Sequence, residues 1–268
     1  MRGGGGQMKR APMPVELWRF RGLLRSLVIR DLRVKYQRSL LGLIWTLLNP
    51  LFTVAVLVTV FTYVIRIQIV HYWAFLISGF FVWNFIQRTL YHSTTILRDH
   101  ASLSRSVYYP PEILILSASL SKLVEFLLEI VIVMIALVVF HHHAIPSSLA
   151  LLPLIVGLQV ILAVGLMFPL AAIAVLYYDV QHALPIVITS LFYISPVFYP
   201  VEMIPVEAQP FYYLNPVVGL LRLFHVVLYE GGWPSATLLA GVSVTAIVTC
   251  AVGHGIFKRC KESCVEIA

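Results

Sequence analysis

The chain has 268 residues, of which 60% are hydrophobic and only 12% are charged. Soluble domains are about 45–50% apolar and about 25% charged, so a soluble fold could not cover this much apolar surface. The formal net charge is +7. The basic residues stand in short blocks beside apolar segments, which is typical of membrane topology and argues against a nucleic-acid partner. Composition therefore excludes an ordinary soluble domain and favours one all-α membrane domain.

The N-terminal end begins with polar and glycine-rich sequence, including four glycines at positions 3–6. We expect residues 1–14 to form a disordered tail. The first apolar run begins near residue 39. It stands too far from the N-terminus, and is too long, to be the core of a cleaved signal peptide.

Residues 15–38 are predicted to form an amphipathic helix in the cytoplasmic membrane interface. Apolar residues recur there at helical spacing, and most polar and basic residues fall on the opposite face. Such a helix is either a plain membrane anchor or a grip for a partner subunit, and we favour the grip. The apolar positions are Leu17, Phe20, Leu24, Leu27, Val28 and Leu32, and the opposite positions are Arg19, Ser26, Arg30 and Arg33.

The transmembrane domain is predicted to cover residues 39–257. A bilayer core of about 30 Å needs about 20 apolar residues in a helix. Several stretches are long enough, and a polar turn at His141–Ser148 divides the longest of them. The six predicted spans are 40–65, 70–91, 113–140, 149–177, 182–199 and 235–257, followed by a cytoplasmic tail at 258–268.

The distribution of Lys and Arg predicts the orientation. Ten of the nineteen precede residue 39, and seven more fall beside the second loop, at the start of the third span or after the sixth span. Only Arg66 and Arg222 remain for the other side. Basic residues accumulate in the cytoplasm, so both termini are predicted to be cytoplasmic.

The third predicted span carries three charges, Lys122, Glu125 and Glu129. A charge at the bilayer centre costs about 2.5–3.5 kcal/mol even on a lenient scale. One interpretation, which we favour, is an ion pair between Lys122 and Glu125 near the inner leaflet. The alternative is a functional role facing a pore or a partner protomer.

The connection at 199–230 contains four prolines followed by an apolar run. Backbone at membrane depth must satisfy its hydrogen bonds internally, so a re-entrant pair of short helices is predicted here.

The sequence contains no G-x-x-x-x-G-K-[ST], H-E-x-x-H, C-x-x-C or G-x-S-x-G motif. His141–His143 are adjacent, so a helix would point them in three directions. We therefore expect no catalytic residue, no metal site and no cofactor in this chain. The spans also lack the chains of buried carboxylates and histidines that proton-driven carriers use. An energy source outside the chain is favoured.

A series of motifs resembles the polysaccharide-exporting ABC transporter permeases, and among them the O-antigen exporters of the Wzm type. Each motif alone is weak, but together their order and spacing are specific. The resemblance covers roughly residues 17–260. The motifs are RDLRVKY at 30–36, SLLGLIW at 39–45 with Asn49-Pro50, LISGFFVWNF at 76–85, VYYPPEIL at 107–114, Asp179-Val180 with His182, SPVFYP at 195–200, Met203–Pro205 and Leu214–Pro216.

The resemblance implies a type-2 ABC exporter fold in the bacterial inner membrane. It implies a homodimer that binds two copies of an ATP-binding subunit, with ATP and Mg held by that subunit. The substrate would be a glycan on undecaprenyl pyrophosphate, and residues 200–230 would be outer gate helices. The 93–112 loop would couple the ATPase to the membrane domain, through candidates Arg98, Leu103, Arg105 and Tyr108.

Three alternatives remain open: a permease for another surface glycan such as capsule or teichoic acid, an exporter of a drug or small lipid, and a membrane-embedded enzyme. The enzyme would need a convergent acid and base set, which the sequence does not suggest.

Two groups of residues are candidates for contact with a glycan lipid. Sugar rings pack on aromatic faces, although aromatic residues also form ordinary belts at membrane interfaces. Arginines could bind a pyrophosphate, although we favour attraction to anionic lipid. The aromatic candidates are Phe192, Tyr193, Phe198, Tyr199, Tyr212 and Tyr213, and the arginines are Arg21, Arg25, Arg30 and Arg33.

Overall fold

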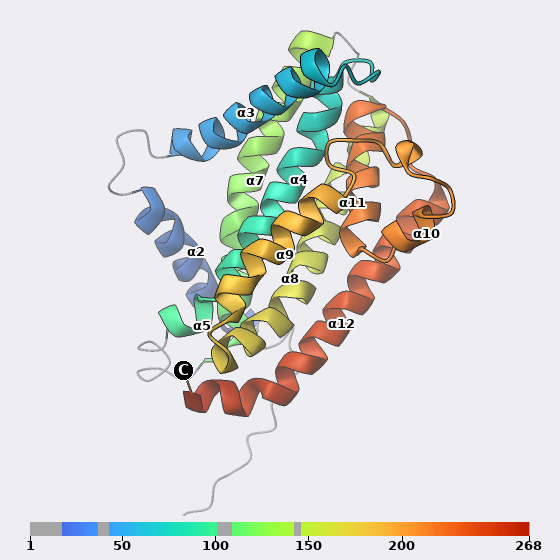
Figure 1. Cartoon of the computed structure of the whole chain (residues 1–268). Helices are drawn as coiled ribbons and strands as arrows, with labels where there is room; N and C mark the ends of the chain where they lie inside the picture. Colours follow the sequence, from blue (N-terminus) through green and yellow to red (C-terminus); the bar gives the residue numbers. More distant parts are fainter. Residues whose placement is uncertain (1–17, 37–42, 101–108, 142–145, 268) are drawn as a thin grey trace, which may run out of the picture.

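The computed structural model describes residues 18–36, 43–100, 109–141 and 146–267. Every regular element in these ranges is a helix (Figure 1). The predicted tail at 1–14 lies outside the described residues. The elements are α2 (Arg21–Tyr36), α3 (Leu43–Thr59), η1 (Val60–Val64), α4 (Tyr72–Ser93), α5 (Ile96–Asp99), α7 (Glu112–His141), η2 (Ser147–Leu151), α8 (Leu152–Leu176), α9 (Val180–Ile194), η3 (Val201–Met203), α10 (Gln209–Tyr212), α11 (Pro216–Phe224), η4 (His225–Tyr229) and α12 (Ala236–Ile267).

Four helices in the described part of the chain are long and apolar enough to cross a membrane, which confirms the all-α membrane class. They coincide with the first, third, fourth and sixth predicted spans. The second and fifth predicted spans correspond to α4 and α9, which are not among these four helices. Helix α4 has 22 residues but carries polar side chains, and α9 has 15 residues, about 22 Å at about 1.5 Å per residue. The four helices cover Ile44–Val64, Glu112–Phe140, Ser147–Leu176 and Ala236–Cys260.

Helix α4 lies at the centre of the bundle, in contact with α3, α7, α8, α9 and α11. Its sequence is apolar on nearly every side, as a helix surrounded by other helices requires. Phe81 and Phe85 are fully buried. Three of the polar exceptions, Asn84, Gln87 and Arg88, are only half-buried and lie near one another on α4. These exceptions mark the side of α4 that faces the candidate site.

Helices α8 and α12 form a closely packed pair. A Cβ atom added to Gly253 would lie 2.0 Å from the carbonyl oxygen of Gly165, so the two backbones touch at these glycines. Small residues allow this close approach between helices in a membrane. Helix α12 continues through Ile267, past the predicted end of the sixth span at residue 257.

Helix α3 runs across the bundle at a steep angle to α4 and α7 (Figure 1). Helix α2 corresponds to the predicted amphipathic helix. It packs on α7, with Leu27 only 3% exposed. Part of the apolar face of α2 therefore packs against α7 instead of facing lipid. The described N-terminal helix and the C-terminal end of α12 lie toward the same end of the molecule (Figure 1).

The 199–230 segment folds into short helices, as its prolines suggest. The side chain of Asn215 accepts a hydrogen bond of 3.0 Å from the Val217 backbone, which caps the start of α11. Helix α11 and η4 pack on α4, and His225 stacks on Phe75 with 4.1 Å between ring centroids. Gly79 permits this contact, because a Cβ there would lie 2.6 Å from His225 Nε2.

Candidate functional site

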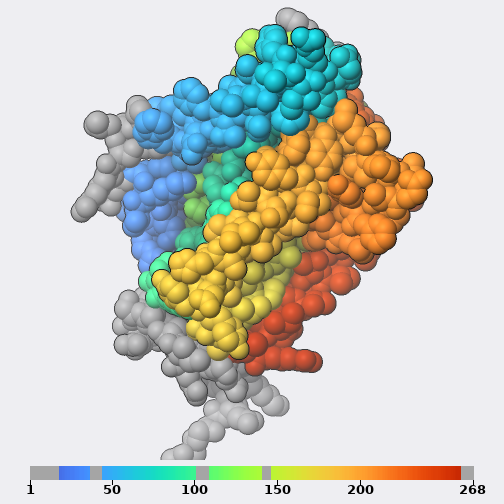
Figure 2. Space-filling model, viewed as in Figure 1, coloured from blue at the N-terminus to red at the C-terminus, as the bar shows by residue number. Residues whose placement is uncertain are grey.

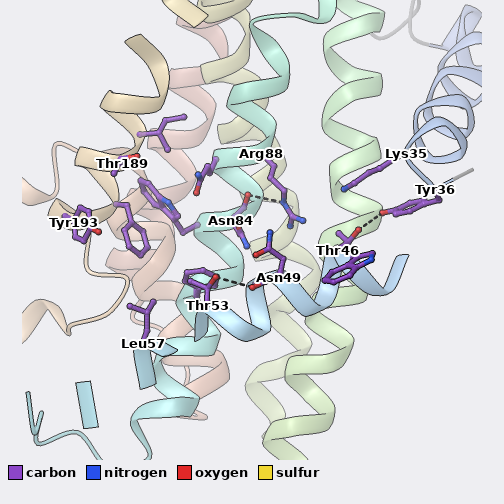
Figure 3. A pocket seen from close by; sticks show the side chains of 17 residues that line it. Lys35, Tyr36, Thr46, Asn49, Thr53, Leu57, Asn84, Arg88, Thr189 and Tyr193 are labelled. Atoms are coloured by element: carbon purple, nitrogen blue, oxygen red, sulfur yellow. Dashed lines mark hydrogen bonds between the residues drawn. The ribbon is translucent and has the colours of Figure 1, made fainter. Parts of the chain in front are cut away.

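A cavity of about 660 Å³ opens between α2, α3, α4 and α9. Figure 2 shows the molecule hollowed between α2, α3 and α9. In the close view, Asn84 and Arg88 of α4 lie in the middle of the wall, near Asn49 of α3 (Figure 3). Lys35 borders one side and Tyr193 the other (Figure 3). We call this cavity the polar pocket.

Five charged side chains form a cluster in the wall of the polar pocket. Arg88 donates hydrogen bonds to both carboxylate oxygens of Glu129, at 2.7 and 2.8 Å, and to Glu125 at 3.3 Å. Lys35 donates to Glu125 at 2.8 Å, and Lys122 donates to Glu125 at 3.4 Å. The residue exposures of Glu125 and Glu129 are only 2% and 0%. The cluster therefore joins α2, α4 and α7 through two deeply buried carboxylates.

The predicted pairing of Lys122 with Glu125 is present, but it is the longest contact of the cluster. The contacts of Lys35 and Arg88 were not predicted. Because Lys35 and Glu125 are 90 positions apart, helical spacing carries no signal for their contact. A basic residue inside the second predicted span, Arg88, was the available clue, since a buried carboxylate needs a cation nearby.

The cluster has three cations and two carboxylates, which leaves one positive charge in excess. Burial lowers the pKa of Lys35 below its ordinary value, and the hydrogen bond to Glu125 opposes this effect. The Lys35 and Arg88 side chains are 38% and 21% exposed, whereas the Glu125 and Glu129 side chains are at most 1% exposed. The accessible side of the cluster is therefore cationic.

The rest of the polar pocket combines aromatic rings with amide and hydroxyl groups. The rings provide apolar faces. The amides and hydroxyls of α3, α4 and α9 provide hydrogen-bond donors and acceptors. This chemistry suits a ligand that is flat, hydroxylated and partly anionic. The aromatic lining residues are Tyr36, Trp45, Phe80, Trp83, Phe192 and Tyr193, and the polar ones are Thr46, Asn49, Thr53, Asn84, Gln87 and Thr189.

Two of the six aromatic candidates, Phe192 and Tyr193, line the polar pocket. Phe192 packs on Trp83, with 5.8 Å between ring centroids, and Tyr193 is 63% exposed at the rim. Phe198 is instead packed between Phe192 and Phe61, with centroid distances of 5.6 and 5.3 Å.

The remaining aromatic candidates lie in the 199–230 connection. The Tyr199 hydroxyl donates a hydrogen bond of 2.6 Å to the Ile194 carbonyl, which satisfies the end of α9. Tyr212 packs beside Tyr199 in a small cluster with Val201. Tyr213 lines a second cavity of about 670 Å³ between α11 and α12.

None of the four arginine candidates of α2 lines the polar pocket. Among the described residues of α2, Lys35 and Tyr36 line the polar pocket and these arginines do not. Arg21 lies over the Trp18 ring at 4.4 Å. Arg30 forms an ion pair of 3.0 Å with Asp31. All four arginine candidates are exposed at the surface of α2, namely Arg21, Arg25, Arg30 and Arg33.

Among the coupling candidates, the described residue is Arg98, whereas Leu103, Arg105 and Tyr108 lie outside the described residues. Arg98 donates to the carbonyls of Ala174 and Val175 at the end of α8, the second at 3.3 Å. Its guanidinium also lies 4.9 Å from the Tyr178 ring centroid. A cation at the last carbonyls of a helix stabilises that end. The contacts therefore place Arg98 at the end of α8, and its coupling role stays a prediction.

Comparison with known proteins places this architecture in a family. The ABC-2 type transporter family matches residues 22–229. The chain is 30% identical to the O-antigen export system permease protein RfbA of Myxococcus xanthus, over 94% of this chain and 97% of the relative. It is 26% identical to the protein of the same name from Klebsiella pneumoniae, over 91% and 94%. It is 22% identical to the polysialic acid transport protein KpsM of Escherichia coli, over 90% and 94%. The chain belongs to the ABC-2 type transporter family.

Proposed function

We propose that this chain is the membrane permease of an ATP-driven exporter of lipid-linked polysaccharide, most specifically O-antigen. The observation that carries the proposal is the polar pocket, where aromatic faces stand beside amide and hydroxyl groups. A sugar ring needs both, because its faces are apolar and its rim is hydroxylated. The M. xanthus and K. pneumoniae relatives, which are O-antigen export system permease proteins, support O-antigen as the cargo.

A capsular glycan is the second candidate. It is favoured by the similarity to the polysialic acid transport protein, which extends over 90% of this chain. The higher identity to the O-antigen permeases favours O-antigen. Teichoic acid is a third surface glycan that the same pocket chemistry would accept. A drug or small lipid would need fewer of the polar groups that line the pocket.

We propose that α4 and α9 also cross the bacterial inner membrane, which makes six spans with cytoplasmic termini. Helix α4 supports this because its burial by five neighbours supplies partners for its polar side chains. Helix α9 is short for a span, but a helix packed against protein can cross where the bilayer thins. Helix α11 and η4 would form the re-entrant outer gate, since irregular backbone is tolerated where protein covers it.

The proposed assembly is a homodimer of this chain with two ATP-binding subunits, which would hold ATP and Mg. The absence of a P-loop motif from the sequence supports a separate ATPase. The cargo would be carried on undecaprenyl pyrophosphate.

Purification tests this assignment directly. The isolated chain is expected to hydrolyse no ATP, and co-expression with its ATPase is expected to give a two-plus-two complex by native mass spectrometry. The complex should restore surface polysaccharide in a strain that lacks its own permease. ATP hydrolysis by the isolated chain, or a complex that leaves surface polysaccharide absent, would contradict the proposal.

The 93–112 loop is proposed to transmit the ATPase stroke. Leu103→Ala and Arg105→Ala should reduce export while ATP binding by the complex persists. The control is Arg98→Ala, which should lower the thermal stability of the membrane domain because Arg98 holds the end of α8. Normal export by both loop variants would place the coupling contact elsewhere.

A further inference from the structure

A third cavity adjoins the polar pocket. It has a volume of about 390 Å³ and lies between α4, α8, α9 and the start of α11, where mostly apolar side chains line it. We call it the apolar pocket. Its wall includes Leu166, Leu170, Ile173, Leu184 and Val187. Trp83, Gln87 and Ile188 line both cavities, so the two meet along α4 and the middle of α9.

We propose that the two pockets form one binding site for an amphipathic lipid with a phosphate-type headgroup. The headgroup would lie at Lys35 and Arg88, and the hydrocarbon chain would lie in the apolar pocket. This inference rests on the proposed function, because it locates the lipid anchor of the exported glycan on this chain.

The charge distribution selects an anionic headgroup. The carboxylates of Glu125 and Glu129 are buried behind the cations, whereas Lys35 and Arg88 reach the polar pocket. An ammonium group carries three donor hydrogens and Lys35 gives one to Glu125, so two remain for a ligand. Asn84 and Gln87 stand on the same wall and supply amide donors. A phosphate oxygen would therefore meet a positive charge and neutral donors together.

The apolar pocket suits hydrocarbon for a different reason. Its lining offers a ligand almost no hydrogen-bonding group, and an apolar cavity of this kind does not hold ordered water. Its volume falls in the range of about 300–1,000 Å³ that ligand pockets occupy. Val187 on its wall is 50% exposed, so the cavity opens at the surface of α9, where a chain could enter sideways from the bilayer.

The junction between the pockets explains why one ligand would use both. Ile188 is 2% exposed and Trp83 is 3% exposed, so both are fixed by packing. A ligand bound across these shared side chains would contact the cationic wall on one side and the aliphatic wall on the other. The proposed phosphate contact therefore lies on Lys35 and Arg88 instead of on the four α2 arginines considered from the sequence.

Lipid binding to the purified complex with its ATPase, measured by native mass spectrometry, tests the proposal. The probes are undecaprenyl diphosphate, the neutral alcohol undecaprenol and inorganic pyrophosphate. We expect undecaprenyl diphosphate to bind at least tenfold more tightly than either other probe. Equal binding of pyrophosphate would indicate a free phosphate site, and equal binding of undecaprenol would remove the headgroup contact. Either result would overturn the proposal.

Variants at two positions separate the two halves of the site. Lys35→Gln should weaken undecaprenyl diphosphate at least tenfold and leave undecaprenol unchanged, and Lys35→Arg should restore the first. Val187→Trp should fill the apolar pocket and weaken both lipids. The matched controls are Arg25→Gln, an exposed cation of α2, and Val248→Trp, an exposed position of α12 outside both pockets. Equal losses in a control and its partner variant would contradict the site.

The remaining outcomes distinguish this inference from the proposed function. A complex that restores surface polysaccharide but binds none of the lipids at these pockets would overturn the inference and leave the function standing. A complex that binds undecaprenyl diphosphate as expected but never restores polysaccharide would do the reverse. If Val187→Trp instead separates the homodimer, a second copy of the chain covers the apolar pocket and the lipid proposal is wrong.

Discussion

Where α12 packs on α8, two glycines bring the backbones into contact, whereas where α2 and α3 face α4, charged and polar side chains border an open cavity. The first region contains Gly165 and Gly253 at the point of closest approach. The second contains the ion pairs of Arg88 with two buried carboxylates. One bundle therefore joins its helices by two different means.

The difference follows from the solvent. Lipid tails are as apolar as leucine, so helices in a membrane associate through close packing, and small residues permit it. Charged groups are costly at the same depth and are found where they serve a pathway or a ligand. The α8–α12 contact therefore serves as a scaffold that holds the bundle together. The polar pocket is instead a surface that can bind a ligand.

The largest expected effect on stability comes from breaking the ion pairs of Arg88. Arg88→Met should destabilise the folded chain by about 3–5 kcal/mol, because it leaves buried Glu129 without the cation that bonds both of its oxygens. The double variant Arg88→Met with Glu129→Leu should recover much of the loss, since no uncompensated carboxylate remains there. Thermal unfolding of the purified protein measures both.

The control for this prediction is Arg25→Met, which removes an exposed cation from α2. It should change the melting temperature little, because exposed charges contribute little to stability. A double variant as unstable as Arg88→Met alone would show that the ion pair is not the reason for the loss.

The next effect tests the scaffold. Gly253→Ala places a methyl group against the Gly165 carbonyl and should cost about 1–3 kcal/mol, because backbone cannot move aside as a side chain can. Gly255→Ala is the matched control, two residues further along α12, where an added Cβ meets nothing within 4 Å. Alanine there should be neutral or slightly stabilising, since it favours helix by up to about 1 kcal/mol. Equal melting temperatures for the two variants would contradict the close-packed contact.

Sequence reasoning predicted the features that depend on local composition. The long apolar runs became α3, α7, α8 and α12, and the amphipathic spacing after residue 17 became α2. The charges of Glu125 and Glu129 were identified as unusual for the same reason, because a carboxylate inside an apolar run is visible without a structure. The local pairing with Lys122 followed from the helix period.

Long-range partners were beyond that reasoning. Arg88 and Glu129 are 41 positions apart, and no periodicity relates the helices that carry them. The aromatic candidates show a second limit. Tyr193 and Tyr199 are close in sequence, but Tyr193 lines the pocket, whereas Tyr199 lies beyond α9 and donates a hydrogen bond back to its last carbonyl. Helix termination at Ile194 separates their roles, and composition does not predict it.

The smallest expected effect on stability belongs to Tyr193, which makes it the clearest test of function. Its side chain is 63% exposed at the rim of the polar pocket, so Tyr193→Ala should hardly change folding. If sugar rings stack on it during passage, the variant should lower surface glycan per assembled transporter several-fold. Tyr193→Phe should be mild, since the ring face stays and only the hydroxyl is lost.

An interfacial aromatic belt would behave in the opposite way. Loss of a belt residue lowers the amount of protein in the membrane but leaves transport per molecule unchanged. Tyr63→Ala is the control, because Tyr63 is 75% exposed on η1 and does not line the polar pocket. Surface glycan per assembled transporter, in a strain without its own permease, distinguishes the two roles. Full export per molecule by Tyr193→Ala would exclude stacking at this rim, and the rest of the pocket lining, with its cationic wall of Lys35 and Arg88, would then be left to contact the cargo.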